Sequence, residues 1–229
     1  YITFDQNGGE DLYYHQCCLN DKNCIECVLI PEEDRFTLCI SSQVGCPLDC
    51  GFCMTGTGGF VRNLKLHEMV DQVFAAQGIL SAEQKITNLV LMGMGEPLLN
   101  YGEVSKFLNI ATHQKGLAFA PRRITVSTSG IIPIIEKLGR ETKVNLAVSL
   151  NATTDDMRNQ LMPINKKYQL KALLNVGRKY PAARNRHITF EYILIQGVND
   201  SIEDARRLVE LLKGIRCKIN LIPFNPFPG

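Results

Sequence analysis

The chain has 229 residues, a net charge of +2, a hydrophobic fraction of 45% and a charged fraction of 21%. This composition is typical of a folded globular protein and excludes an intrinsically disordered chain. The longest apolar run, Ile86 to Met94, has the length of a strand and falls far short of the roughly 20 residues that a membrane-spanning helix needs. The nearly neutral charge neither requires nor excludes a nucleic-acid partner.

The chain starts at Tyr1 without an initiator methionine and stops at Gly229 with no closing helix, so we expect both ends to be cut from something longer. It shows no signal peptide, and we expect a cytoplasmic protein. Nine cysteines, an odd number, indicate metal or redox chemistry more than structural disulfides.

Strand-like and helix-like segments alternate from residue 37 onward. We expect strands at Thr37–Ser41, Ile86–Met92, Arg123–Ser127, Lys143–Leu150, His187–Ile193 and Lys218–Ile222. We expect helices at Leu66–Leu80, Val104–His113, Ile132–Leu138, Asp155–Leu161, Leu170–Lys179 and Ile202–Lys213. Ser201 is the expected N-cap of the last helix, and Gly214 its stop.

Strands spaced by helices predict βα units and a parallel sheet. About six units predict an α/β fold with a partial, open (β/α)6 barrel, because a closed barrel has eight. Residues 1–36 are expected to form a small N-terminal β element, which divides the chain into regions 1–36 and 37–229. The active site is then expected at the carboxyl ends of the strands.

Three cysteines follow the first predicted strand of the barrel, in the loop Gly45-Cys46-Pro47-Leu48-Asp49-Cys50-Gly51-Phe52-Cys53. Three thiolates with Cys-x3-Cys-x2-Cys spacing can hold three irons of a cubane cluster and leave the fourth iron open to a substrate. Zinc prefers four ligands, commonly as two separated pairs. The alternative of three buried structural cysteines fits poorly with a loop rich in glycine and aspartate.

Polar residues also end the following strands. Gly93-Met94-Gly95-Glu96-Pro97 follows one strand, and Ser127-Thr128-Ser129-Gly130 and Ser149-Leu150-Asn151 end the next two. Each is explained on its own as a turn or a helix cap. Three polar strand ends on one rim favour a ligand site instead, and Asn225 after the last strand is placed to join it.

The cysteine triplet after a first barrel strand resembles the signature of radical S-adenosylmethionine (radical SAM) enzymes. Four longer strings resemble the RlmN family of dual-specificity RNA methyltransferases, from about Glu26 to Gly229. They are Leu38-Cys39-Ile40-Ser41-Ser42-Gln43-Val44-Gly45-Cys46, Met92-Gly93-Met94-Gly95-Glu96-Pro97-Leu98-Leu99-Asn100, Met162-Pro163-Ile164-Asn165 and Lys218-Ile219-Asn220-Leu221-Ile222-Pro223. Pro97 and Ser129 favour this family over the related Cfr methyltransferases, which modify carbon 8 of adenine.

The resemblance implies a role for each matching residue. Cys46, Cys50 and Cys53 would bind one 4Fe-4S cluster. The residues at SAM-contact positions are Gly95, Glu96, Ser127, Ser149, Leu150, Asn151 and Asn225, with Asn151 standing where many relatives have histidine. Glu26 falls at the position of a proton acceptor, and Cys39 at that of a thiol that resolves a covalent protein–RNA intermediate through a disulfide. Without the resemblance, Glu26 is equally a solvated strand residue and Cys39 a buried core thiol.

The resemblance further implies methylation of carbon 2 of an adenine in 23S ribosomal RNA and of an adenine beside the anticodon of transfer RNA. The implied reaction consumes two SAM molecules, uses a 5′-deoxyadenosyl radical and passes through a methylated cysteine expected beyond Gly229. A reductase such as flavodoxin is the implied electron donor, and the expected state is a monomer with no membrane partner. A cluster-bearing RNA-binding or redox-sensing module without turnover is the competing interpretation.

Four further cysteines, Cys17, Cys18, Cys24 and Cys27, have no place in this scheme. They are candidates for a zinc site or a second cluster. On a regular strand, however, residues three apart point to opposite faces, which favours incidental thiols.

Overall fold

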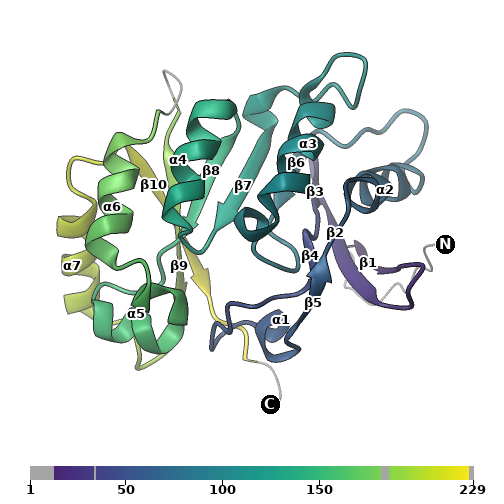
Figure 1. Ribbon diagram of the computed structural model, residues 1–229. Coiled ribbons are helices and arrows are strands. Elements are labelled where there is room, and N and C mark those ends of the chain that lie inside the picture. The colour runs from purple at the N-terminus through teal and green to yellow at the C-terminus, as the bar shows by residue number, and fades with distance from the viewer. Residues whose placement is uncertain (1–12, 34, 182–185, 227–229) are drawn as a thin grey trace.

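The computed structural model describes residues 13–33, 35–181 and 186–226. One sheet of eight strands organises the fold, in the order β1-β2-β3-β6-β7-β8-β9-β10 (Figure 1). The strands are β1 (Tyr13–Cys18), β2 (Cys24–Glu32), β3 (Arg35–Cys39), β6 (Asn88–Leu91), β7 (Ile124–Thr128), β8 (Asn145–Ser149), β9 (Ile188–Leu194) and β10 (Cys217–Pro223). The edge strands β1 and β10 do not pair with each other, so the barrel is open.

The six strands from β3 to β10 in this sheet run parallel, as the sequence predicts. Helices connect them: α2 (Leu66–Gln77), α3 (Tyr101–Thr112), α4 (Ile132–Glu141), α5 (Asp155–Leu161), α6 (Leu170–Lys179) and α7 (Ile202–Leu212). The predicted α/β class with an open (β/α)6 barrel is therefore confirmed. Most predicted elements agree with the observed ones to within two or three residues, and α5 and α6 agree at both ends.

The N-terminal region extends this sheet. β1 and β2 form an antiparallel hairpin, and β2 pairs antiparallel with β3. The predicted β element at residues 1–36 therefore joins the barrel edge through its described part, while residues 1–12 lie outside the described residues. A short second sheet, β4 (Gln43–Gly45) with β5 (Phe60–Asn63), and the helix α1 (Met54–Thr57) surround the cysteine loop. This small unit was not predicted from the sequence.

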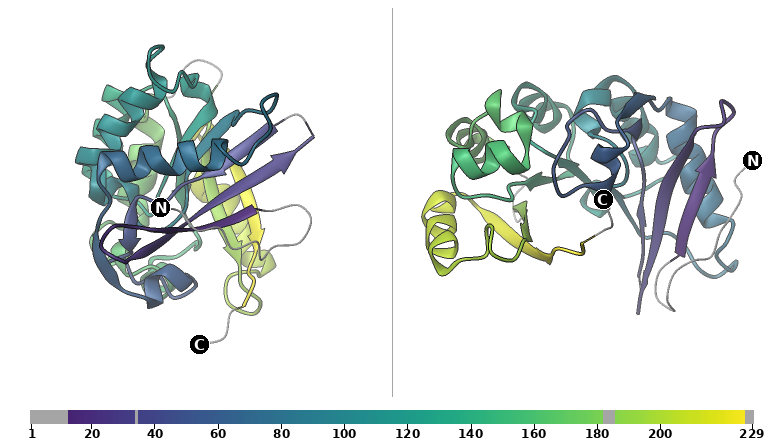
Figure 2. Two further views of the ribbon diagram at one scale, coloured as in Figure 1. Left: turned by 90° about the vertical axis from the view of Figure 1, so that its right-hand side faces the viewer. Right: turned by 90° about the horizontal axis from the view of Figure 1, so that it is seen from below.

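The sheet has two unlike faces. Figure 2 shows the helices gathered on one side of it, here called the outer face. Strand residues that point to this side, such as Leu38, Leu89, Val126 and Phe190, are at most 1% exposed and belong to the main hydrophobic core. Alternate residues point to the opposite, inner face. These inner positions include Cys39, Ser127, Ser149 and Glu191, so the inner face is polar at the carboxyl ends of the strands.

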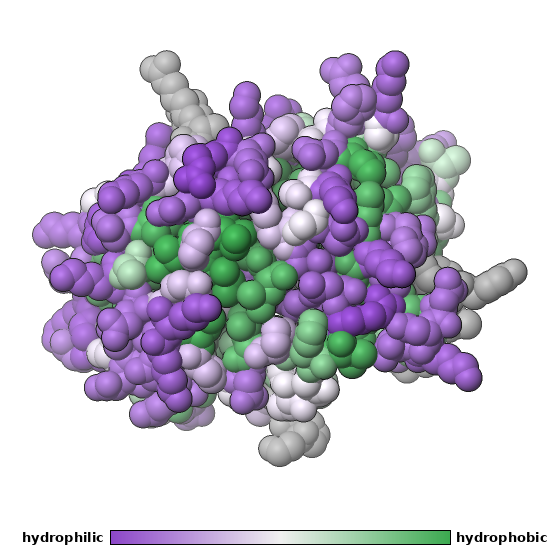
Figure 3. Space-filling view, viewed as in Figure 1, coloured by the Kyte–Doolittle hydropathy of each residue, from purple (hydrophilic) through white to green (hydrophobic). Residues whose placement is uncertain are grey.

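Local sequence explains how the helices begin and end. The Ser201 hydroxyl caps α7 by accepting a 3.0 Å hydrogen bond from the Asp204 amide, and Gly214 follows the helix with φ of +78°. Both features were predicted. On α7, Leu208 and Leu212 are buried in the main hydrophobic core, whereas Val209 is exposed to solvent. Figure 3 shows that the surface formed by the helices is mainly hydrophilic, with hydrophobic side chains visible between the helices. Among the described residues, none of the helices combines the length and hydropathy required to cross a membrane.

Candidate active site

The cysteine loop is anchored at its start by buried amides. Gln72 of α2 accepts a 2.8 Å hydrogen bond from the Ser41 amide and donates one of 3.1 Å to the Ser41 carbonyl. Asn100 donates to the carbonyls of Ser42 and Leu64 at 2.9 and 2.8 Å. Both side chains are at most 4% exposed. These hydrogen bonds therefore fix the backbone of Ser41 and Ser42, which connects β3 to the loop that carries Cys46.

Gly45 allows the sharp turn into Cys46. Its φ is +73°, and a Cβ at this position would lie 1.9 Å from the Gly59 carbonyl oxygen. The Cys46 amide donates a 2.9 Å hydrogen bond to the same oxygen. No other residue type fits this contact without moving the backbone.

The three cysteines reach one cavity of about 370 Å³ at the carboxyl ends of the parallel strands. The structure thus brings together most of the predicted site residues on one rim. Those that line the cavity are Cys46, Cys50, Cys53, Gly95, Glu96, Ser127 and Ser149. Phe52 lines it as well and packs beside the cysteines.

The environment of the thiols suits a metal cluster. Burial raises the pKa of Cys46 to about 11 and that of Cys50 to about 12, and the negative charges of Glu96 and of neighbouring thiolates add to the effect. Thiolates at this place therefore require a positively charged group, which iron supplies. Within the described residues no three His, Cys, Asp or Glu side chains are arranged around a single ion. Three soft ligands on one loop beside an open cavity fit a polynuclear cluster with an accessible iron.

Glu96 presents a buried carboxylate to the same cavity. It caps the 3-10 turn Pro97–Asn100, and its Oε2 accepts a 2.7 Å hydrogen bond from the Ser129 amide while its Oε1 accepts one of 3.1 Å from the Leu98 amide. Burial raises the pKa of this carboxyl, and these amide hydrogen bonds oppose the rise. No lysine or arginine among the described residues forms an ion pair with it, so the site offers a carboxylate to a cationic ligand group.

The glycines of the Gly93-Met94-Gly95 string are required by protein packing. A Cβ on Gly93 would lie 2.8 Å from the Ile40 carbonyl carbon, and one on Gly95, where φ is +97°, would lie 2.4 Å from the Gln43 Cβ. Gln43 in turn accepts a 2.8 Å hydrogen bond from the Glu96 amide. The glycines, expected from sequence to admit a ligand, also let the β6 loop approach the cysteine loop closely enough to fix Glu96.

Glu26 and Cys39 do not line this cavity, although the Cys39 thiol is close enough to Met92 and Glu191, which do line it, to be affected by both. Cys39 pairs with Val28 in the register of β2 and β3, which puts Glu26 at the diagonal position on the same face. The Glu26 side chain is exposed, and its carbonyl accepts a 2.5 Å hydrogen bond from Ser41. Burial raises the pKa of Cys39 to about 11. Their predicted catalytic roles stay predictions.

Three predicted SAM contacts do not line the cavity. Leu150 is fully buried, and Asn225 is exposed after β10. Asn151 is buried with φ of +56°; its Oδ1 accepts a 2.9 Å hydrogen bond from the Ile193 amide, and its Nδ2 lies 3.4 Å from the Met162 sulfur. In this arrangement the Asn151 side chain joins β8 to β9. Its ligand role, like those of Leu150 and Asn225, stays a prediction.

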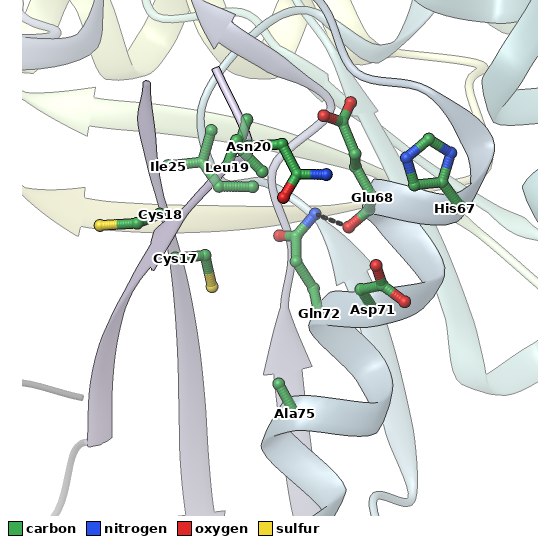
Figure 4. Close-up of a pocket in the computed structure, with 10 residues that line it drawn as sticks. All are labelled: Cys17, Cys18, Leu19, Asn20, Ile25, His67, Glu68, Asp71, Gln72 and Ala75. Carbon is green, nitrogen blue, oxygen red and sulfur yellow. Dashed lines mark hydrogen bonds between the residues drawn. The ribbon is translucent and has the colours of Figure 1, made fainter. Parts of the chain in front are cut away.

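The four N-terminal cysteines form two separate cross-strand pairs. The sulfurs of Cys18 and Cys24 are 3.2 Å apart, and those of Cys17 and Cys27 are 3.6 Å apart. Figure 4 shows the side chains of Cys17 and Cys18 pointing in different directions, and both residues line a cavity of about 430 Å³ between the hairpin and α2. The four sulfurs therefore do not converge, and the sequence argument from strand alternation is confirmed.

The expected disulfide is not supported. Cys39 is a free thiol. The sulfur separations of the two close pairs exceed the roughly 2.05 Å of a disulfide bond. A disulfide at Cys39 needs a second thiol at bonding distance, and the described part of the chain supplies none.

Two residues at the site were missed in the sequence. Arg158 is fully buried below the rim and donates to the Ser129, Ser149 and Leu150 carbonyls. Glu191 lines the cavity from β9 and accepts a 2.9 Å hydrogen bond from the Ser127 hydroxyl. A glutamate between Phe190 and Tyr192 in an otherwise apolar strand was the available signal for Glu191. Arg158 gave none, because an arginine in a short helix is usually solvated.

An open parallel barrel with a three-cysteine loop at its carboxyl rim defines a cluster-binding α/β enzyme fold. The family model described as "Radical SAM superfamily" matches residues 40–210, so the chain belongs to the radical SAM superfamily. Membership implies a 4Fe-4S cluster and SAM as cofactors.

Comparison with known proteins narrows this class. The chain is 56% identical over 211 residues to the dual-specificity RNA methyltransferase RlmN of Geobacter sulfurreducens, covering 92% of this chain and 58% of the relative. It is 55% identical over 221 residues to the RlmN of Chelativorans sp. (strain BNC1), covering 90% and 54%. The chain thus spans little more than half the length of these curated relatives.

Among solved structures, a radical SAM methyltransferase from Sphaerobacter thermophilus matches with a TM-score of 0.94 and 44% identity, over 100% of this chain and 68% of that one. Streptococcus suis SuiB matches with a TM-score of 0.58 at 14% identity over 82% of this chain, a likeness of fold alone.

Proposed function

We propose that the protein is a radical SAM RNA methyltransferase that modifies carbon 2 of adenine in 23S ribosomal RNA and in transfer RNA next to the anticodon. The observation that carries the proposal is the shared cavity, where Cys46, Cys50 and Cys53 meet Glu96 and the serines of two neighbouring strands. The similarity to RlmN proteins at more than 50% identity supports the choice of substrate. A cytoplasmic monomer supplied with electrons by a flavodoxin-type reductase completes the proposal.

In this proposal, different residues of the chain bind the cluster and SAM. Cys46, Cys50 and Cys53 hold the cluster, which when bound supplies the electron that cleaves SAM to a 5′-deoxyadenosyl radical. The Glu96 carboxylate, fixed by the Ser129 and Leu98 amides, accepts hydrogen bonds from the ammonium group of SAM. Phe52 and the buried Met162 limit access of water to the cysteine side of the cavity.

In this proposal, Glu26 accepts a proton, and Cys39 is the thiol that resolves the covalent protein–RNA intermediate. With a pKa near 11, the Cys39 thiol keeps its proton at neutral pH and becomes a nucleophile only when a base removes it. The Glu26 carboxylate lies on the same face of the neighbouring strand and is exposed to incoming RNA. The target adenine has to leave its stack to reach this surface.

The first experiment is anaerobic and uses the protein after reconstitution with iron and sulfide. With dithionite and SAM, the wild type is expected to form 5′-deoxyadenosine, whereas Cys50→Ala, with one ligand fewer, is expected to form none. Absence of 5′-deoxyadenosine from a wild type that carries the cluster would contradict the proposal at its centre.

A second experiment decides the substrate. The protein in its natural full length is incubated with 23S ribosomal RNA and transfer RNA, and digested nucleosides are separated by mass spectrometry. We expect 2-methyladenosine from both. Formation of 8-methyladenosine would identify a Cfr-like enzyme, and RNA binding without methylation would identify a non-catalytic module.

A further inference from the structure

The amino ends of four neighbouring strands carry basic side chains for which the proposed function has no use. β7 to β10 each begin within two residues of a cation, and α4 ends beside one. Parallel strands begin at the same edge of a sheet, so these cations share the end of the barrel opposite the cysteine loop, at the top of Figure 1. We call them the basal row: Arg122 and Arg123 before β7, Arg140 in α4, Lys143 before β8, Arg186 before β9 and Arg216 before β10.

Part of the basal row surrounds a cavity of about 240 Å³. Arg140, Lys143 and Arg186 line it together with His187, and among the described residues no aspartate or glutamate does. The Arg186 guanidinium donates a hydrogen bond to the Lys143 carbonyl, which holds the arginine beside the lysine. Arg140 and Lys143 are exposed. The cavity therefore offers several cationic donors to an anion.

The basal row lacks acidic partners. The chain has 25 lysines and arginines against 23 aspartates and glutamates, so acids are numerous enough to accompany most cations. Nevertheless, no member of the row forms an ion pair within the part of the chain that the structure describes. Glu141, next to Arg140 in the sequence, instead accepts a 2.8 Å hydrogen bond from the Tyr101 hydroxyl and pairs with Lys137. The positive charge of the row is thus left for a partner outside this fold.

The length of the strands separates the basal row from the active-site cavity. β7 and β8 have five residues each, and β9 and β10 have seven. At about 3.3 Å per residue, the row lies roughly 15–25 Å from the carboxyl rim. No side chain of the row can touch SAM or the target base over this distance. A role in the proposed reaction is therefore the binding of a more distant part of the substrate.

The chemistry of the row favours the phosphates of a nucleic acid. Five of its six cations are arginines, and a guanidinium donates two parallel hydrogen bonds to a phosphate. Neighbouring strands lie about 4.8 Å apart, so the cations recur along the edge of the sheet as phosphates recur along an RNA strand. Contacts of this kind hold the backbone and do not read the base sequence.

We propose that the basal row is a second RNA-binding surface, which holds backbone phosphates of the folded substrate at a distance from the target adenine. This inference rests on the proposed function, in which RNA is the substrate. It adds a contact at the end of the barrel opposite the chemistry. Binding there is sensitive to salt, because each phosphate contact releases counterions from the RNA.

The test removes two charges of the row and leaves the fold intact. Arg140 and Lys143 are exposed, and neither side chain has a hydrogen bond or ion pair with another described residue. Arg140→Gln/Lys143→Gln should therefore unfold at the same urea concentration as the wild type. The matched control is Lys106→Gln/Arg206→Gln, which removes two exposed cations that already face acids on α3 and α7.

The measurement is the dissociation constant of a transfer RNA transcript from the cluster-loaded protein in its natural full length, over a range of salt concentrations. At about 0.1 M salt we expect the basal variant to bind about tenfold more weakly than the wild type. The slope of log K against log salt should fall in magnitude by about two, one for each lost phosphate contact. The control should keep the wild-type affinity and slope.

A second readout separates binding from chemistry. At saturating transcript, the basal variant should form 2-methyladenosine at the wild-type rate, because neither side chain reaches the reacting atoms. Its KM for RNA should rise in proportion to the dissociation constant. Arg122→Gln/Arg216→Gln, which changes the row at the strands on either side, should show the same pattern.

The outcomes are distinguishable. A wild type that neither binds nor methylates RNA would overturn the proposed function and this inference together. A wild type that methylates RNA, with a basal variant of unchanged affinity and slope, would overturn the inference alone, as would equal losses in the basal variant and the control. Lost binding of polyglutamate with unchanged affinity for the transcript would overturn it in favour of an acidic protein partner.

Discussion

The guanidinium of Arg158 lies 2.7 Å from the carbonyl oxygen of Ser129, the residue whose amide holds Glu96. The same group donates to the Ser149 and Leu150 carbonyls and to Asn165. Burial lowers the pKa of Arg158 to about 10, so it remains charged at neutral pH. One buried cation thus binds the carboxyl ends of β7 and β8 from beneath the cavity.

Replacing Arg158 should therefore affect both stability and SAM binding. A lysine cannot serve four acceptors in this fork geometry, and it leaves buried carbonyls unpaired. We expect Arg158→Lys to lower the free energy of unfolding by about 3 kcal/mol or more, measured by urea denaturation. Arg206→Lys, on the exposed side of α7, should change it by less than about 0.5 kcal/mol. Equal effects of the two variants would contradict a structural role for the buried network.

Gly45 supplies a second test, which separates backbone geometry from chemistry. Gly45→Ala places a Cβ against the Gly59 carbonyl, so the turn into Cys46 cannot form as in the wild type. We expect this variant to have a lower free energy of unfolding and a lower iron content after reconstitution. The control is Gly102→Ala in α3, where a Cβ meets nothing within 4 Å. This change should stabilise the protein by about 0.5–1 kcal/mol. Iron retained at the wild-type level in Gly45→Ala would show that the turn tolerates a side chain.

Iron binding should distinguish the two groups of cysteines. Serine in place of Cys46, Cys50 or Cys53 removes a ligand and is expected to abolish the cluster absorbance after reconstitution. The double variant Cys18→Ser/Cys24→Ser should bind as much iron as the wild type, because its sulfurs lie on the N-terminal hairpin. Substantial loss of iron from the hairpin variant would place a metal there.

The pH dependence of stability follows from Glu191. Burial raises its pKa in the folded protein above the unfolded value of about 4.3. Its contribution is fully favourable below the unfolded pKa and is lost as the pH rises through the folded pKa, because ionisation is harder in the fold. The unfolding free energy of Glu191→Gln relative to wild type should thus increase on going from pH 4 to pH 8. A difference that is constant over this range would contradict the raised pKa.

The barrel strands and the cysteine loop could be predicted because their signals are local. Alternation of apolar segments located β6 and β9, and the spacing of Cys46, Cys50 and Cys53 located the loop. The inner-face acid Glu191 could not be assigned in the same way. Its partners Ser127 and Ser149 are 64 and 42 residues away in the sequence, and only the parallel register brings them together.

The ligand-contact positions also show where sequence reasoning stops. Glu96 and Ser127 line the cavity as expected, but the Asn151 side chain is used to join β8 to β9. A turn residue with positive φ can serve either purpose, and sequence alone does not say which way its side chain points. The β4–β5 unit was missed for a related reason: strands of three and four residues are too short for a periodic signal.

The contrast between the two faces of the sheet has a consequence for how this sequence tolerates change. Along β7, β8 and β9, residues at even positions pack in the hydrophobic core beneath the helices, whereas the odd-numbered residues Ser127, Ser149 and Glu191 line the cavity. Saturation mutagenesis read out separately for abundance and for SAM binding should therefore split with a period of two along these strands. Substitutions at Val126, Val148 and Phe190 should reduce abundance, whereas those at Ser127, Ser149 and Glu191 should leave an abundant protein with an altered ligand preference.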